Sequence, residues 1–353
     1  MIIVTGTIAY DYIMDFPGSF GDHILPDQTH KINLSFIVNK FARRRGGTAG
    51  NVSYSLGLLK IPHILFSVAG KDFGEYKKDF QKLNISLDNV SIDKNNYTAT
   101  GFAMTDKKDN QIWGYFYGAT EKMSQLDLSK VTTRVYLKTT QRRHSGKSVS
   151  RRTHPESPMT VRDAGQASMT GFEARSRKNL VLIGPSGSKG SMSLVKQCVD
   201  LKIPYMFDPG FILTQVNDRD LEFGVSRCSY LIGNEYEINL IKKRIKKWRG
   251  LFKNKSIITT LGDKGSVIES KGLVYKIKSA KPKKVVDPTG AGDAYRAGFL
   301  AGLEKGFDIK TCGQMGSVAS SYAVEEYGTQ EHKFTKAQFA KRYKDTYNKA
   351  LEL

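Results

Sequence analysis

Residues 287–293 read Asp287-Pro288-Thr289-Gly290-Ala291-Gly292-Asp293 and run directly into the helical pattern AYRAGFL at 294–300. We expect Val285-Val286, just before them, to be the end of a short apolar strand. A strand, a turn of small residues and a helix start together form a phosphate-binding device. The first N–H groups of a helix have no partner inside it and point outward at its positive end.

The residues of this turn predict two groups that a phosphoryl transfer needs, an anion hole and a base. Gly290, Ala291 and Gly292 have little or no side chain, so their N–H groups could form an anion hole for a phosphoryl group. Asp293 is a carboxylate placed to take a proton from an acceptor hydroxyl. The simpler interpretation is a Gly-rich turn whose Asp only caps a helix. An anion hole beside a base instead predicts a small-molecule kinase.

The flanking residues extend this stretch into a long and specific motif. From DPT at 287–289 to AGF at 297–299, it resembles the C-terminal signature of the ribokinase-like (PfkB) family of carbohydrate and nucleoside kinases. RGGTAGNV at 45–52, followed by SLG at 55–57, resembles the N-terminal signature of that family. The two motifs occur in the family's order and at a family-like distance. The resemblance implies a kinase that uses ATP and Mg²⁺.

Several further stretches extend the resemblance to the bacterial adenosine kinases of ribokinase shape, among them VTGTIAYDYIMDFPGSF at 4–20 and YGTQE at 327–331. The match covers about residues 1–130 and 178–335. It implies that Asp11 grips two hydroxyls of the acceptor, since a carboxylate accepts two hydrogen bonds. The other residues implied to contact a nucleoside are Thr7, Ser35, Gly47 and Asn51, with Phe102 and Tyr115 stacking on the base.

The same resemblance implies an ATP site and two cation sites. NEYE at 234–237 matches the family's NxxE motif, which implies that Glu237 holds Mg²⁺ through water. Asp287 and Thr289 resemble the family's monovalent-cation site, so a potassium requirement is a further expectation. The residues implied to contact ATP are Asn234, Thr260, Gly262, Gly265, Val318 and Tyr322.

Short apolar runs that end at glycines or acids predict an α/β fold. They are LVLIG at 180–184, PYMFDPG at 204–210, YLIGN at 230–234 and IITTLG at 257–262, and helical patterns alternate with them. This alternation favours one domain over 1–353 with a mainly parallel sheet and helices on both faces. Ligands then gather at the carboxyl ends of the strands.

Two segments break the alternation and predict a small β lid over the substrate. Residues 31–42 and 97–117 read as extended, with a charged hairpin turn near 107–110, and the lid segments span about 12–45 and 95–120. The rings expected in the lid favour a purine over a simple sugar, because they offer stacking surfaces. We therefore expect the 5′-hydroxyl of adenosine as the acceptor. A free sugar such as ribose and another nucleoside such as inosine or guanosine are the alternatives.

Residues 131–177 do not fit the rest of the chain. They contain eight Arg, two Lys and three acidic residues, whereas Lys greatly outnumbers Arg elsewhere. Without apolar periodicity they read as an inserted basic loop or as a frame error that replaced the natural connection, and we favour the frame error. In either case the segment is expected to be dispensable.

The net charge of +21 raises nucleic acid as a partner, and a basic nucleic-acid-binding protein is the alternative from another class. No nucleic-acid-binding motif accompanies the charge, so we expect no specific binding. We expect no membrane span, and scattered cysteines with no metal spacing fit a reducing cytoplasm. A homodimer through the lid is a further expectation. A silent binding module should have lost Asp293 or the glycines, and both are kept.

Overall fold

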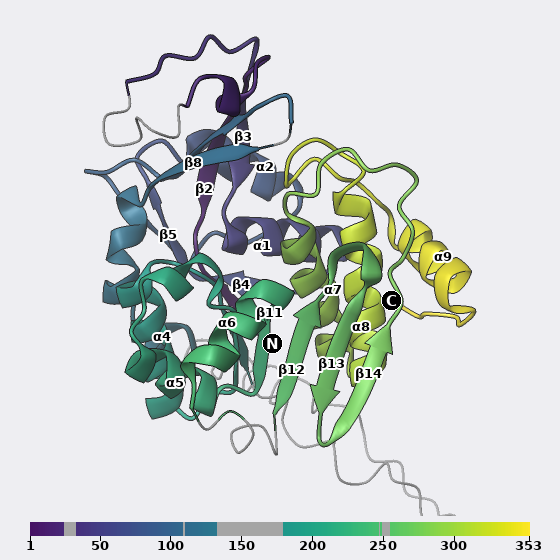
Figure 1. The fold of residues 1–353 in the computed structure, drawn as a ribbon. Helices are drawn as coiled ribbons and strands as arrows, with labels where there is room; N and C mark the ends of the chain where they lie inside the picture. Colours follow the sequence, from purple (N-terminus) through teal and green to yellow (C-terminus); the bar gives the residue numbers. More distant parts are fainter. Residues whose placement is uncertain (25–32, 109, 133–178, 247, 249–254) are drawn as a thin grey trace, which may run out of the picture.

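The computed structural model of the chain describes residues 1–24, 33–108, 110–132, 179–246, 248 and 255–353. These residues form a central eight-stranded sheet with helices on both faces, and a second, smaller sheet lies above one edge of it (Figure 1). Of the anomalous segment 131–177, all but the first two residues lie outside the described residues.

The central sheet confirms the predicted fold class. Its strand order is β14-β13-β12-β11-β10-β9-β1-β4, and all neighbours from β4 to β12 are parallel. β13 pairs antiparallel with β12, and the edge strand β14 pairs antiparallel with β13. The four predicted apolar runs form β9, β10, β11 and β12. The strands are β1 (Ile2–Thr5), β4 (His63–Leu65), β9 (Leu180–Ile183), β10 (Tyr205–Phe207), β11 (Tyr230–Asn234), β12 (Ser256–Thr260), β13 (Ser266–Ser270) and β14 (Leu273–Ile277).

Successive residues of each strand point to opposite faces, so the sheet separates two hydrophobic cores. In β9, for example, Leu182 belongs to one core while Val181 and Ile183 belong to the other. Helices α1 (Thr48–Leu58), α2 (Gly74–Lys82), α7 (Ala291–Lys305), α8 (Ile309–Ala323) and α9 (Lys336–Tyr347) contribute to the first core. Helices α4 (Ser188–Asp200), α5 (Asp218–Arg227) and α6 (Glu235–Arg244) contribute to the second.

The smaller sheet has the order β3-β2-β7-β8 and is called the lid sheet here. It consists of β2 (Ala9–Asp15), β3 (Lys40–Gly46), β7 (Ala99–Thr105) and β8 (Gln111–Phe116). Two short strands, β5 (Ser67–Gly70) and β6 (Val90–Asp93), pair separately. Figure 1 shows β2, β3 and β8 above α1 and α7, so the lid sheet overhangs the start of α7.

The structure corrects two details of the predicted strands. Residues 33–38 form no strand, and β3 instead begins at Lys40 and runs to Gly46. Val285 and Val286 also form no strand, because they lie in the connection between β14 and α7 without a sheet neighbour. Val285 is 71% exposed, and the N–H of Val286 donates to the carbonyl of Val324 after α8.

Candidate active site

The start of α7 is open to a ligand at the carboxyl edge of the central sheet. Gly290 is the N-cap residue in a left-handed conformation, and α7 begins at Ala291. The N–H of Ala291 donates to the carbonyl of Pro288. Within the described part of the chain, the N–H groups of Gly292 and Asp293 have no backbone acceptor. The N–H of Gly290 also has no acceptor among these residues, so the N–H groups of Gly290, Gly292 and Asp293 are free to bind an anion, whereas Ala291, also predicted for the anion hole, uses its N–H within the turn.

Asp293 is fixed by a hydrogen bond from the neighbouring helix α1. The Nδ2 group of Asn51 on α1 donates to Oδ2 of Asp293 at 2.8 Å. Burial raises the pKa of Asp293 to about 6, although the nearby Arg296 guanidinium and the Asn51 hydrogen bond both lower it. A carboxylate with such a pKa can accept a proton near neutral pH.

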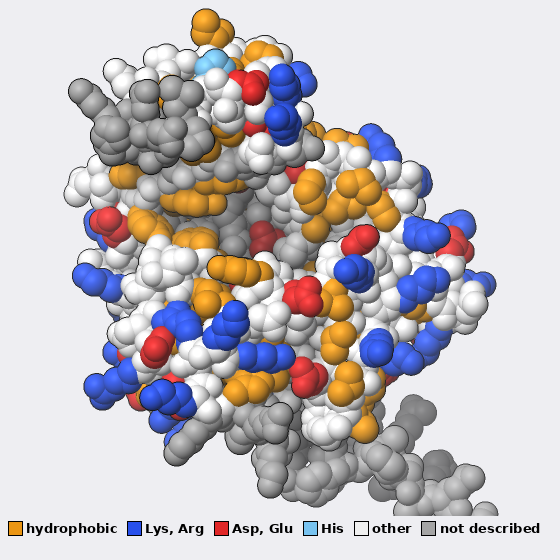
Figure 2. Space-filling view, viewed as in Figure 1, with side chains coloured by type: hydrophobic (Ala, Val, Ile, Leu, Met, Phe, Trp, Pro, Cys, Tyr) orange, Lys and Arg blue, Asp and Glu red, His pale blue; other side chains and the backbone are white. Residues whose placement is uncertain are grey.

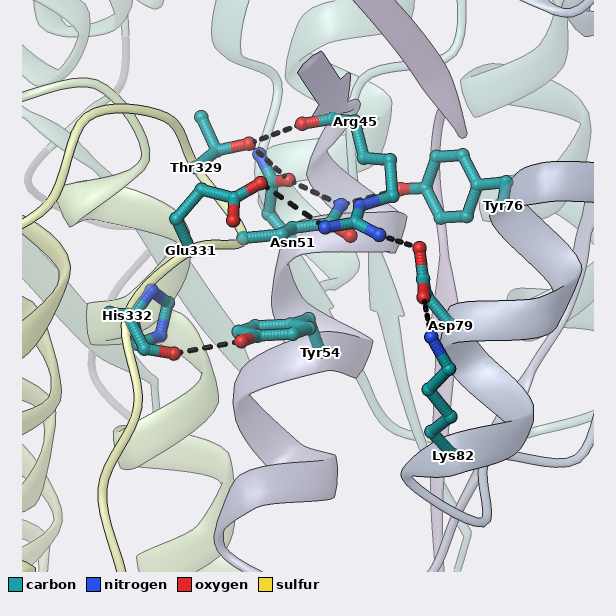
Figure 3. A network of polar contacts seen from close by, with 10 residues as sticks. Arg45, Asn51, Tyr54, Tyr76, Asp79, Lys82, Thr329, Glu331 and His332 are labelled. Atoms are coloured by element: carbon teal, nitrogen blue, oxygen red, sulfur yellow. Dashed lines mark hydrogen bonds and ion pairs between the residues drawn. The ribbon is translucent and has the colours of Figure 1, made fainter.

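Asn51 itself is held by a polar network that joins α1, α2 and the loop after α8 (Figure 3). Its Oδ1 accepts hydrogen bonds from Thr329 Oγ1 and from Gln330 Nε2, both at 2.8 Å. Arg45 extends the network through ion pairs with Asp79 and Glu331. With both ends of its amide engaged, Asn51 presents its N–H to Asp293 in a fixed orientation.

Asp11 lies on the lid side of the same cleft. A Cβ at Gly46 would lie within 2 Å of its carboxylate oxygen, so the glycine makes room for this side chain. Burial, reinforced by the charge of Asp293, raises the pKa of Asp11 to about 7. The described residues offer the Asp11 carboxylate no hydrogen-bond donor, which leaves its oxygens available to a ligand.

The two carboxylates line one cavity of about 220 Å³ between the lid sheet and α7. Figure 2 shows the hollow below the lid, with hydrophobic side chains around its rim. Predicted residues that line it are Thr7, Asp11, Gly47, Asn51, Tyr115, Gly290 and Asp293. A second cavity of about 350 Å³ adjoins it and shares Asp11, Trp113, Thr289 and Thr329.

Two residues predicted to contact the substrate lie elsewhere. Ser35 is exposed in the irregular segment before β3 and lines neither cavity. Phe102 lies on the outer face of the lid sheet, where it stacks on Tyr12 with ring centroids 5.3 Å apart. Strand alternation places its neighbour Gly101, opposite Tyr115, on the inner face.

The NxxE motif forms the start of α6. Oδ1 of Asn234 accepts a hydrogen bond from the N–H of Glu237, and Oε2 of Glu237 accepts one from the N–H of Asn234, each at 2.8 Å. This capping box explains the spacing of the motif without a metal. Burial and the nearby charge of Asp208 raise the pKa of Glu237. Thr260 lies beside Asn234 in the parallel pairing of β11 and β12.

The other residues predicted to bind ATP differ in their accessibility. Gly262 is exposed in the turn after β12, whereas Gly265 is buried against the backbone of Ile277. Val318 is fully buried in the core. Tyr322 is also buried and packs against Phe334. Neither Val318 nor Tyr322 offers a surface to a nucleotide, because the small-residue helix α8 turns these side chains inward.

Asp287 organises the loop that precedes the anion hole. Its carboxylate accepts hydrogen bonds from the N–H of Thr289 at 2.8 Å and from the N–H of Gly328 at 3.0 Å. Asp287 thereby ties the DPTGAGD turn to the Tyr327–Thr329 loop that supports Asn51.

Sequence reasoning missed four residues that complete the site. Thr329 and Gln330 orient Asn51, and Phe211 lines the cavity opposite the lid. Asp208, directly after β10, forms a buried ion pair with Arg296. A polar residue at the carboxyl end of a predicted parallel strand, as in PYMFDPG, is the signal that could have identified Asp208.

Comparisons with known proteins agree with this geometry. The pfkB family carbohydrate kinases match residues 18–336. The nucleoside kinase of Methanothermobacter thermautotrophicus is 28% identical over 347 residues, which covers 97% of this chain and 95% of that protein. The adenosine kinase of Saccharomyces cerevisiae is 41% identical, but only over 21% of this chain and 22% of its own.

Among solved structures, the Burkholderia thailandensis nucleoside kinase in complex with inosine is similar over 99% of both chains, with a TM-score of 0.78 and 27% identity. The same enzyme has been solved with ADP and inosine, and that structure has a TM-score of 0.76 to this chain. The family motifs therefore occupy the same fold as in these kinases. This chain belongs to the pfkB family of carbohydrate kinases and is a phosphotransferase that acts on a hydroxyl group.

Proposed function

We propose that this chain transfers the terminal phosphoryl group of ATP to the 5′-hydroxyl of adenosine. The observation that carries the proposal is the single cavity that brings together Asp293, the start of α7, Asp11 and a wall of aromatic rings. A base and an anion hole serve any kinase of this family. Among the substrates of the family, a nucleoside is favoured by Asp11, which can accept hydrogen bonds from a diol, and by the aromatic rings.

In the proposed reaction Asp293 takes the proton of the 5′-hydroxyl as the oxygen attacks the terminal phosphorus of ATP. The bond from that phosphorus to the ADP oxygen breaks, and its electron pair leaves with ADP. The N–H groups of Gly292 and Asp293 stabilise the charge of the transferring group. Asp11 accepts hydrogen bonds from the 2′- and 3′-hydroxyls and so sets the ribose in place.

The acidic side chains at the carboxyl edge of the central sheet suit a Mg²⁺ ion. Asp208, Glu237 and Asp293 gather there, and burial together with the negative charges of their neighbours raises the pKa values of Glu237 and Asp293. The described residues contain no group of three side chains that could hold a metal ion directly. We therefore expect Glu237 to contact Mg²⁺ through water. When bound, Mg²⁺ would neutralise phosphate charge on ATP.

The base is expected to bind against rings from both sides of the cavity. Trp113 and Tyr115 on β8 are stacked at 5.5 Å between centroids, and Tyr115 is nearly parallel to Phe211 at 5.9 Å. Phe211 belongs to η4 (Gly210–Thr214) on the central sheet with its helices, which is called the body here. A nucleobase that binds between lid and body would gain stacking area that ribose alone lacks.

Inosine is the second candidate acceptor, because the Burkholderia thailandensis enzyme was solved with it. The test is product identification with ³²P-labelled ATP and each of adenosine, inosine and ribose. The expected product is the nucleoside 5′-monophosphate. Labelled ribose phosphate as the main product, or transfer to another hydroxyl, would contradict the proposal.

A potassium requirement is proposed from Asp287 and Thr289. Two backbone N–H groups occupy part of the Asp287 carboxylate, and its remaining lone pairs could bind a cation. Replacing K⁺ by tetramethylammonium should then lower kcat. Unchanged kcat would indicate that Asp287 only stabilises the loop.

We also propose a homodimer through the outer face of the lid sheet. This face exposes Phe41 (64%), Phe102 (46%) and Ile112 (48%), an unusual cluster for a free surface. Light scattering should give the mass of a dimer, and Phe41→Ser should weaken it. A monomeric wild type would contradict this assembly.

The compartment is proposed to be the cytoplasm. Cys198, Cys228 and Cys312 are buried and free. Among the described residues, none of the helices has the length and hydropathy needed to cross a membrane.

A further inference from the structure

The ion pair between Arg296 and Asp208 lies beside the anion hole and takes no part in the mechanism above. Arg296 is on α7, one turn after Gly292, and Asp208 directly follows β10. Their side chains are only 9% and 2% exposed. Nη2 of Arg296 donates to Oδ1 of Asp208 at 2.7 Å, and Nε donates to Oδ2. This bidentate pair fixes the guanidinium at the carboxyl edge of the central sheet.

The third nitrogen of the guanidinium is not used by Asp208. Nη1 of Arg296 has no hydrogen-bond partner among the described residues, and it is not one of the fully buried orphan atoms. A Cβ at Gly292 would lie 2.8 Å from it. Because Gly292 has no side chain, Nη1 can lie close to the free N–H groups at the start of α7.

Charge makes this nitrogen a suitable partner for a phosphate. Asp293, Glu237 and Asp208 surround Arg296, so carboxylates outnumber the one guanidinium. A polyphosphate that approaches these carboxylates is repelled unless cations offset them. Arg296 is the protein's own cation at this place, and a guanidinium matches phosphate oxygens in geometry.

We propose that Arg296, held by Asp208, donates hydrogen bonds from Nη1 to the terminal phosphoryl group of ATP during its transfer. The proposal rests on the phosphoryl transfer described above and adds a side-chain donor to its anion hole. Arg296 remains protonated throughout, because the proton of the acceptor goes to Asp293 and the bonding electrons leave with ADP. Asp208 is a positioning residue, since it acts only through Arg296.

A purely structural role is the alternative, because a buried ion pair also joins α7 to β10. Arg342 and Glu325 provide the matched control. They form a similarly buried pair, with side chains 10% and 11% exposed and Nη1 2.9 Å from Oε1. This pair joins α9 to the end of α8 and lines neither cavity. Arg342→Gln therefore removes a buried ion pair outside the phosphoryl site.

The first test compares Arg296→Gln with Arg342→Gln in nucleotide affinity and in turnover with adenosine. Loss of one anion-hole donor should lower kcat by about 10²–10³, with little change in the KM for adenosine. Affinity for the ATP analogue AMP-PNP with Mg²⁺ should fall roughly tenfold, whereas affinity for ADP should stay, since ADP lacks the terminal group. Arg342→Gln should change melting temperature only. The two affinities need no acceptor, so they test Arg296 even if adenosine is not the substrate.

The pH dependence gives a readout that lost stability would not move. The groups that face Asp293 are Asn51 from α1, Asp11 from β2, Arg296 on α7, Asp208 after β10 and Glu237 on α6. Burial raises the pKa of Asp293, and of these groups the Arg296 guanidinium and, to a smaller extent, the Asn51 hydrogen bond lower it. In Arg296→Gln the acid limb of kcat should therefore move to higher pH, and in Arg342→Gln it should stay.

Two further variants keep the test decisive. Asp208→Asn keeps the Arg296 charge but loosens its hold, so its loss of kcat should be smaller and not additive with that of Arg296→Gln. If Arg296→Gln does not fold, Arg296→Lys preserves the charge and should still lose selectivity for AMP-PNP over ADP. The proposal is overturned if folded Arg296 variants keep kcat within about threefold and bind AMP-PNP as the wild type does.

Discussion

The two sides of the cavity are built differently. On the body side Asn51 bonds Asp293, Thr329 and Gln330, so the groups at the start of α7 are fixed before any ligand arrives. On the lid side the Asp11 carboxylate lacks a donor among the described residues, and Tyr115 is 61% exposed. The difference teaches that the body side is preorganised for chemistry, whereas the lid side is completed by the acceptor.

The largest effect is expected from the body side. Asp293→Asn keeps the shape and can still accept the Asn51 hydrogen bond, but it cannot take a proton at neutral pH. A positioned base contributes on the order of 10²–10⁴ in rate, so kcat should fall by that factor while the Kd for ATP stays. Turnover above about a tenth of wild type would show that Asp293 is not the base.

Removal of the lid-side carboxylate should act mainly on the acceptor. Asp11→Ala leaves two hydroxyls without their acceptor, which costs roughly 1–3 kcal/mol, or about tenfold to a hundredfold in kcat/KM for adenosine. The KM for ATP should be unchanged. 2′-Deoxyadenosine should be a poor substrate for the wild type, and equal efficiency for the two nucleosides would disprove the diol contact.

The pH profile should report both sides together. Asp293, with its pKa of about 6, is the base only when ionised, and Asp11, with its pKa of about 7, accepts hydroxyls best when ionised. Activity is therefore present above these values and is lost as pH falls through them. Each protonation should lower kcat/KM by about tenfold per pH unit. A profile that is flat from pH 8 to pH 5 would contradict this assignment.

The rings should give a smaller effect confined to the acceptor. Tyr115→Ala and Phe211→Ala each remove stacking area, worth on the order of 1 kcal/mol, so the KM for adenosine should rise severalfold at similar kcat. Phe102→Ala is the matched control, since its ring packs on Tyr12 on the other face of the same sheet. An equal change in KM for Phe102→Ala would mean that the rings act through the lid's stability.

The smallest effect is expected from the segment 131–177, of which only residues 133–177 are replaced, because Val131 is buried in the second core. A Gly/Ser linker in their place should leave kcat and melting temperature nearly unchanged, because halving the length of a loop changes its closure entropy by only about 0.6 kcal/mol. The measurement compares both quantities in the shortened and full chains. Unfolding, or lost adenosine affinity while the full chain is active, would show that the segment is structural.

The sequence predicted the body side better than the lid side, for a physical reason. Buried parallel strands leave unbroken apolar runs, and the turn at 287–293 is contiguous in the chain. Which lid residues face the cavity depends on register. Gly101 pairs with Tyr115, so Phe102 must point outward, and no single strand reveals that pairing.

Other errors have similar causes. Val285 and Val286 are apolar enough for a strand but lie where no neighbouring strand can pair with them. The partners of Arg296 and Asn51 are distant in sequence, at Asp208 and at Thr329, so only the folded chain brings them together.

The most direct measurement of the division between body and lid is the ratio of kcat/KM for adenosine to that for ribose. Both values are measured by ADP release with ATP and Mg²⁺. Ribose can use Asp293, the anion hole and Asp11, but it cannot use the rings. The account predicts that adenosine is preferred by at least about tenfold, which one good stacking contact supplies. Equal efficiency, or a preference for ribose, would contradict it.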